Sequence, residues 1–233
     1  MEKVEFLAMT CAEFAQCDEK PKKTAWMACH FSPYGTGLSN LPQTLPEGSM
    51  LIVNDRIPIC AHDPNQIAEE LKALVSAFSC ETVLLDLQRE NIPETDAVVK
   101  AVLSVLTCPV GVSDLYAGKY DCPVFLPPPE LDVPLSSHLA PWEGREIWLE
   151  AALDMAQFTV TEKGCASLSL PYSPPDGNFF RDDGLCCSYC CDIRPDAAIF
   201  TLWRTPKDLA DLLTQAQALG IHRTIGLYQQ LNI

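Results

Sequence analysis

Short apolar runs that alternate with amphipathic segments constrain the fold of this chain more than any other feature. The runs lie at residues 49–55, 82–86 and 109–114, and each ends in polar residues, which is typical of a strand buried on both faces. Between them, residues 67–78 and 98–106 place apolar side chains on one helical stripe. The spacing of about 30 residues indicates consecutive βαβ units of a parallel sheet.

The chain on either side of these units fits the same sheet. Residues 25–30 are typical of an earlier strand, and residues 224–228 are typical of a final one. The final strand follows a helix that begins after Thr205 and ends at Gly220, since Thr and Gly are favoured at these two helix ends. We therefore expect one sheet to use both ends of the chain.

Two pairs of short runs in the second half predict β-hairpins, at 158–161 with 166–170 and at 185–193 with 198–203. A (β/α) barrel with some helices missing or replaced by these hairpins fits this order, and an open doubly wound sheet is the alternative. The open sheet normally carries a glycine-rich phosphate loop, and the sequence has no such motif. We therefore expect residues 1–233 to form a single, compact and irregular TIM-type barrel.

The charge balance limits the partners. The chain has 16 Lys and Arg against 31 Asp and Glu, a net charge of −15, which opposes unaided binding to nucleic acid or to an anionic membrane. No uncharged apolar run approaches the roughly 18 residues of a membrane helix, and the first residues do not resemble a signal peptide. These features predict a cytoplasmic protein with no nucleic-acid or membrane partner.

Polar and aromatic residues gather where the predicted strands end, which is where sites form in both candidate architectures. Carboxylates and aromatic faces suit a glycan or another small molecule, and glycoside hydrolysis needs two facing carboxyl groups. The candidate catalytic residues are Asp86, Glu90, Asp114 and Glu150. The candidate ligand-binding residues are His30, Tyr34, Asn54, Asp55, Gln88, Tyr116, Trp148 and Tyr228. The alternative is that these residues only pair or solvate the strand ends.

Residues 81–88, Glu-Thr-Val-Leu-Leu-Asp-Leu-Gln, resemble the strand-end signature D-x-x-D-x-D-x-E of the family-18 glycosidases, the chitinase-like barrels. In this register Asp86 matches the Asp that supports the general acid, whereas Leu84 replaces the middle Asp and Gln88 replaces the catalytic Glu. A Gln cannot donate a proton to a leaving oxygen, but it can bind a sugar hydroxyl. The resemblance implies a degenerate glycan-binding barrel or a hydrolase that uses other carboxylates, such as Glu90, Asp114 or Glu150.

Twelve cysteines are present, and Cys187 and Cys190 form a C-x-x-C pair. In an extended strand, residues three apart point to opposite faces, so this pair is badly placed to chelate one ion. Apolar neighbours favour packing of reduced thiols, and we expect neither a metal nor a cofactor. A Cys-based metal or redox protein and a non-catalytic interaction or structural protein remain the alternative functions.

Overall fold

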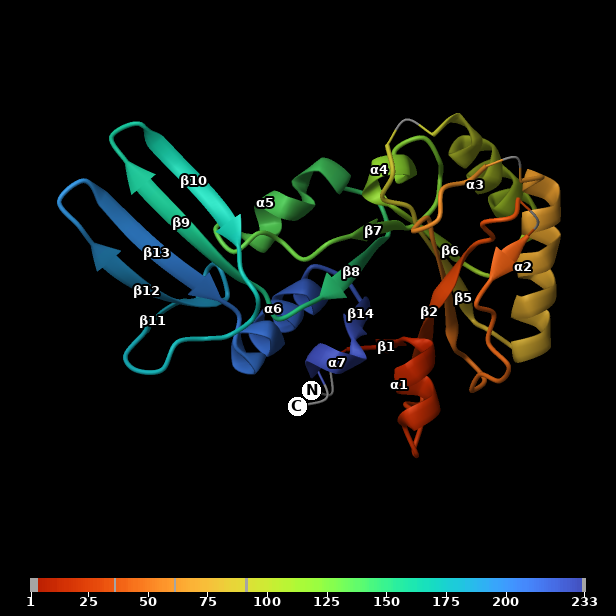
Figure 1. The fold of residues 1–233 in the computed structure, drawn as a ribbon, viewed down its shortest axis with the longest axis horizontal. Helices are drawn as coiled ribbons and strands as arrows, with labels where there is room; N and C mark the ends of the chain where they lie inside the picture. Colours follow the sequence, from red (N-terminus) through yellow and green to blue (C-terminus); the bar gives the residue numbers. More distant parts are fainter. Residues whose placement is uncertain (1–3, 36, 61, 91, 232–233) are drawn as a thin grey trace.

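The computed structural model describes residues 4–35, 37–60, 62–90 and 92–231. Eight parallel strands close into a barrel (Figure 1), which confirms the predicted fold class. Its closure depends on β1, which pairs with β14 on one side and with β2 on the other. The barrel strands, in chain order, are β1 (Phe6–Met9), β2 (Thr24–Phe31), β4 (Met50–Asn54), β5 (Thr82–Asp86), β6 (Val110–Ser113), β7 (Val124–Leu126), β8 (Ile147–Ala151) and β14 (Arg223–Leu227).

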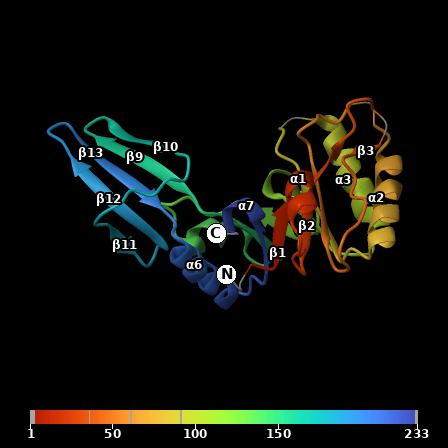
Figure 2. The same ribbon diagram turned by 60° about the horizontal axis from the view of Figure 1, so that its bottom comes forward.

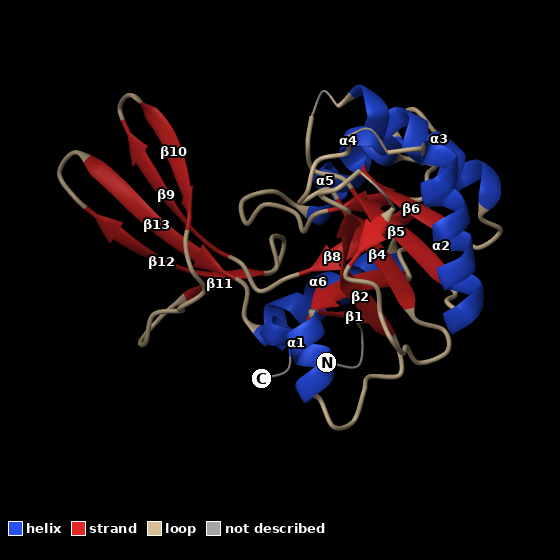
Figure 3. Ribbon diagram, turned by 45° about the vertical axis from the view of Figure 1, so that its right-hand side comes forward, coloured by secondary structure: helices blue, strands red, loops and turns tan. Residues whose placement is uncertain are grey.

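The helices lie outside the barrel and are unequal in length (Figure 3). Asp63 caps α2 by accepting a hydrogen bond from the backbone N–H of Asn65 at 2.9 Å, and Thr205 caps α6 through a capping box with Asp208. The helices are α1 (Cys11–Gln16), α2 (Pro64–Phe78), α3 (Pro93–Val105), α4 (Asp114–Ala117), α5 (Leu135–Leu139), α6 (Pro206–Ala218) and α7 (Tyr228–Leu231), with a 3₁₀ turn at Ala140–Trp142. Within the described chain, β2 and β4 are joined without a helix, through the short antiparallel strand β3 (Leu38–Ser39).

A second, antiparallel sheet is inserted between β8 and α6 and extends away from the barrel (Figures 1 and 2). Both predicted hairpins are present in it, but they pair with each other through β9 and β13 instead of joining the barrel. The sheet therefore has the order β10-β9-β13-β12-β11. Its strands are β9 (Met155–Thr161), β10 (Gly164–Ser169), β11 (Phe180–Asp182), β12 (Cys187–Ile193) and β13 (Ala197–Trp203).

The barrel interior is filled by inward-facing side chains, among which Trp148 is fully buried. Trp148 fits because β6 carries Gly111 beside it: a Cβ atom at Gly111 would lie only 2.3 Å from a carbon of the indole ring. The guanidinium carbon of Arg223 lies 4.8 Å from the same ring. These buried side chains fill the barrel below the large cavity that opens at the carboxyl ends of its strands.

A larger core packs α2, α3 and α6 against the outer faces of the strands. In the part of the chain that the structure describes, every helix is too short or too polar to cross a bilayer.

Candidate functional site

The carboxyl ends of the barrel strands surround a cavity of about 900 Å³. It is lined by side chains from β2, β4, β5 and β8 and from the segments that follow β4, β5 and β6. The sequence-predicted residues that line this cavity are His30, Asn54, Asp55, Asp86, Gln88, Asp114 and Glu150. The structure therefore brings seven of the twelve predicted side chains together at one opening.

The floor of the cavity is apolar. Leu84 lies two residues before Asp86 on the same inward face of β5, and Phe125 approaches from β7. No carboxylate stands behind Asp86 on this strand, so Asp86 and Gln88 are the polar groups that β5 and its loop present.

Asp86 and Gln88 are joined directly, because Gln88 Nε2 donates a hydrogen bond to Asp86 Oδ1 at 2.6 Å. Burial raises the pKa of the Asp86 carboxyl; the Gln88 hydrogen bond opposes this rise, and the negative charges of Asp55 and Asp114 add to it. The pair fixes the direction of the Gln88 amide, which leaves its carbonyl oxygen available to accept a hydrogen bond.

Glu150 enters the cavity from β8, two residues after Trp148 and on the same face of the strand. Burial raises its pKa from 4.5 to about 7, and the nearby charges of Asp86 and Asp154 contribute to the rise. Close to neutral pH this carboxyl therefore exists in both protonation states. It can donate a proton or accept one, which Gln88 cannot do.

Asp55 has a supporting role that its position in the sequence does not reveal. It is only 4% exposed, and its two carboxylate oxygens accept the backbone N–H groups of Gln88 at 3.0 Å and Arg89 at 2.8 Å. The Arg89 guanidinium in turn donates to the backbone carbonyls of Asp55 and Arg56. This clamp holds the loop after β5 against the end of β4 and so positions Gln88.

Asn54 and His30 are also held by hydrogen bonds at the rim. Asn54 Nδ2 donates to the carbonyls of Met27 and Cys29, both at 3.0 Å, across a register shift in β2. His30 Nδ1 lies 2.8 Å from the Phe31 carbonyl and its Nε2 lies 3.1 Å from Asn40 Nδ2. Because a carbonyl only accepts, these contacts fit a neutral ring with the proton on Nδ1.

The other five predicted residues lie elsewhere in the described structure. Tyr34 is 88% exposed, and Trp148 is buried in the barrel with its Nε1 donating to Glu146. Glu90 and Tyr116 line a separate hollow of about 400 Å³ beside α3 and α4. Tyr228 begins α7, where its hydroxyl lies 3.6 Å from Cys17 Sγ. The aromatic surfaces expected at the mouth are thus replaced by Phe125 and aliphatic side chains.

Thr10 and Cys11 were missed in the sequence because they follow β1, a strand that was not predicted. Thr10 and Cys11 begin α1 directly after the four-residue strand β1. A usable signal was present: Thr10 and Glu13 form a capping box immediately after an apolar run. Arg56, Asn40 and Pro127 complete the rim. Across the described residues, no group of three or more His, Cys, Asp or Glu side chains is placed to hold a metal ion.

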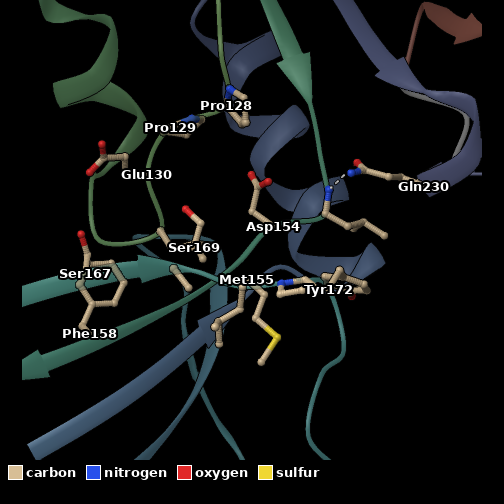
Figure 4. Close-up of a pocket in the computed structure, with 15 residues that line it drawn as sticks. Pro128, Pro129, Glu130, Asp154, Met155, Phe158, Ser167, Ser169, Tyr172 and Gln230 are labelled. Carbon is tan, nitrogen blue, oxygen red and sulfur yellow. Dashed lines mark hydrogen bonds between the residues drawn. The ribbon is translucent and has the colours of Figure 1, made fainter.

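A second, adjoining cavity of about 450 Å³, whose lining follows that of the first along the chain after Pro127 and after Glu150, lies between the loop after β7, the end of β8 and the inserted sheet (Figure 4). Pro127 lines the first cavity, and Pro128 and Pro129, which follow it, line the second. The second cavity also contains the carboxylates of Glu130 and Asp154.

Asp154 is anchored at 3.2 Å by the fully buried Arg204, whose other terminal nitrogen donates to the Pro129 carbonyl at 2.7 Å. Burial nevertheless raises the pKa of Asp154, and the Arg204 charge opposes that rise. One buried guanidinium therefore ties the end of the inserted sheet to two walls of this second cavity.

Comparison with known proteins identifies relatives only at the level of structure. No protein-family model matches the sequence, and no curated protein matches it either. The similar solved structures include a family-18 N-acetylglucosaminidase from Paenibacillus barengoltzii (8% identity, 96% of this chain and 94% of that chain, TM-score 0.60). Another is the spore cortex-lytic enzyme SleL of Bacillus cereus (9% identity, 96% and 70%, TM-score 0.56).

A third is a double mutant of a family-18 chitinase from Cycas revoluta in complex with (GlcNAc)4 (9% identity, 96% and 94%, TM-score 0.56). Identities this low concern the fold alone. The chain has the fold of the family-18 glycoside hydrolase barrels: a TIM barrel with an added antiparallel sheet.

Proposed function

We propose that the mouth of the barrel binds a carbohydrate. The observation that carries this proposal is the convergence of Asp86, Gln88 and Glu150 on one cavity whose floor is apolar. A sugar ring offers an apolar face and a rim of hydroxyl groups, and this combination of walls and hydrogen-bonding groups complements both. The cavity volume of about 900 Å³ falls within the range of small-molecule sites.

The comparisons support an oligosaccharide of the N-acetylglucosamine type as the first ligand to test. The structures with this fold are described as chitinases, an N-acetylglucosaminidase and spore cortex-lytic enzymes. The chitinase that holds (GlcNAc)4 carries a Glu-to-Gln substitution. In the register proposed from the sequence, Gln88 stands at the signature's Glu position, and this register supports binding over cleavage at that position.

Hydrolysis is the second candidate, and the properties of Glu150 favour it. A carboxyl whose pKa is about 7 can act as a general acid near neutral pH, while Asp86, on another strand of the same cavity, acts as the base or nucleophile. This arrangement would move the acid from the β5 loop to β8. It predicts turnover that depends on Glu150 and not on Gln88.

Calorimetric titration with GlcNAc oligomers tests the binding proposal. We expect Gln88→Ala and Asp86→Asn each to weaken binding by about tenfold or more, since each removes a hydrogen bond to the ligand or its orienting partner. Glu69→Gln on the outer face of α2, where Glu69 is 63% exposed, is the matched control and should bind as the unmodified chain does. Failure of the folded, unmodified chain to bind any glycan would overturn the proposal.

Product analysis of the same incubations by mass spectrometry tests the second candidate. Turnover that disappears in Glu150→Gln and persists in Gln88→Ala supports it. Turnover that survives in both Glu150→Gln and Asp86→Asn contradicts it.

A further inference from the structure

We infer that the ligand of this barrel is a cationic amino-sugar oligomer, one whose sugars carry free ammonium groups in place of N-acetyl groups. The inference rests on the proposed function and names the chemical class of its ligand. Two features of the described structure carry it: the uncompensated carboxylates in the mouth and their continuation into the adjoining cavity.

The mouth contains more negative charge than its neighbours neutralise. Its lining includes four carboxylates but one guanidinium, that of Arg56. The Asp55 carboxylate is satisfied by the backbone N–H groups of Gln88 and Arg89. In contrast, no Lys or Arg in the described ranges forms an ion pair with Asp86, Asp114 or Glu150. Three carboxylates thus face the cavity without a cationic partner.

An ammonium group is the complement that these three carboxylates lack. It has three donors and no acceptor, so it can bond to more than one carboxylate oxygen at once. The attraction is stronger in a partly buried cavity than in water, because the effective dielectric constant is lower there. An N-acetyl group offers a single neutral donor to the same oxygens, and an anionic sugar would be repelled.

The adjoining cavity is also lined by carboxylates, of which Asp154 is paired with Arg204 and Glu130 has no ion pair among the described residues (Figure 4). Glu130 and Asp154 contribute carboxylates to it, and its lining contains no Lys, Arg or His among the described residues. Arg204 holds Asp154 from behind, and its guanidinium is fully buried. Glu130 is exposed and has no ion pair within the described part of the chain. A ligand that continues past Pro127 therefore meets a second carboxylate-lined space, which favours a repeating cation over a single one.

The remaining surfaces of the cavities select a sugar and not merely a cation. The floor of the mouth is formed by Leu84 and Phe125, and the adjoining cavity is lined in part by Met155 and Phe158. The apolar faces of pyranose rings can lie against these side chains while their amino groups reach the carboxylates. The net charge of −15 on the whole chain attracts such a polymer and disfavours an anionic one.

The test compares ligands of equal length and different charge by calorimetry, at about 20 mM and about 200 mM salt. The probes are (GlcN)4, (GlcNAc)4, cellotetraose, tetragalacturonate and spermidine. We expect (GlcN)4 to bind about tenfold or more tightly than (GlcNAc)4 at low salt, with the advantage shrinking at high salt. Glu150→Gln and Asp154→Asn should each reduce that advantage, whereas Glu69→Gln, on the outer face of α2, should leave it unchanged. Circular dichroism of each variant establishes that it is folded.

The outcomes separate this inference from the proposed function. Binding of (GlcNAc)4 as tight as that of (GlcN)4 overturns the inference and leaves carbohydrate binding intact. Binding of none of the sugars overturns the proposed function and the inference together. If spermidine binds as tightly as (GlcN)4 does, the site recognises positive charge and not the sugar, and the inference is overturned. The inference is also overturned if Glu150→Gln and Asp154→Asn both leave the affinity advantage of (GlcN)4 over (GlcNAc)4 unchanged.

Discussion

The Asp55 clamp leads to a quantitative prediction about stability. Asp55→Ala removes two charge-assisted hydrogen bonds, to the backbone N–H groups of Gln88 and Arg89, from a site where Asp55 is only 4% exposed. Hydrogen bonds to a charged group contribute about 1.5–3 kcal/mol each. Gln88 and Arg89 are exposed, so water can replace part of the loss. We therefore expect the free energy of unfolding to fall by about 2–4 kcal/mol.

Urea unfolding followed by circular dichroism measures this loss, provided that the m-value is unchanged. Asp63→Ala is the comparison, because the exposed Asp63 carboxylate accepts one backbone N–H group at the start of α2 and its loss should cost about 1 kcal/mol. Asp55→Asn keeps one acceptor oxygen, so its loss in free energy of unfolding should lie between those of Asp55→Ala and Asp63→Ala. If Asp55→Ala destabilises the chain no more than Asp63→Ala does, the clamp does not contribute as described.

Three further predictions concern the barrel and its mouth. The pKa of Glu150 is raised from 4.5 to about 7 by burial and by Asp86 and Asp154. As the pH rises, the Glu150 carboxyl therefore loses its proton at a lower pH in the unfolded chain than in the folded chain. The free energy of unfolding accordingly falls as the pH rises from 4.5 to about 7. Glu150→Gln should therefore raise the free energy of unfolding by about 1–3 kcal/mol at pH 8 and leave it unchanged at pH 4; equal effects in urea unfolding at both pH values would contradict this. Gly111→Ala should destabilise the chain by about 2 kcal/mol or more, because its Cβ collides with Trp148, and an unchanged melting temperature would refute the packing. Cys11 is exposed in the mouth, and Cys165 is exposed on the inserted sheet. Of these two thiols, (GlcN)4 should slow the alkylation of Cys11 alone, as measured by peptide mass spectrometry. Equal protection of both thiols would count against a ligand in the mouth.

The middle of the barrel could be predicted from the sequence because its pairings are local. Each run from residue 49 to residue 114 pairs with the next one along the chain, so apolar periodicity and helix caps determine both the elements and their order. Strand β1 escaped prediction because its four residues, Phe6–Met9, form too short a run. Its burial depends on β14, at the other end of the described chain, and no local pattern contains that information.

The site could be predicted where strand alternation alone decides the direction of a side chain. Asp86 and Glu150 follow the inward positions Leu84 and Trp148 by two residues, so their arrival at the mouth is a consequence of the pleat. The fate of Trp148 itself was not predictable in this way. Whether an inward aromatic residue lines a cavity or fills the interior depends on the residue facing it, and here Gly111 leaves the space that Trp148 occupies.

Closure of the barrel by β14 has a consequence for the growing chain on the ribosome. Ile225 pairs with Phe6 and Glu150, so β1 and β8 both remain open edges until the last strand emerges. At about 5–20 residues per second, synthesis from Ala151 to Leu227 lasts roughly 4–15 s. The β9–β10 and β12–β13 hairpins form on the microsecond scale and emerge during that interval. The nascent chain therefore completes these hairpins while its barrel is still an open sheet with two edges available for pairing, which is the state in which it is most exposed to aggregation.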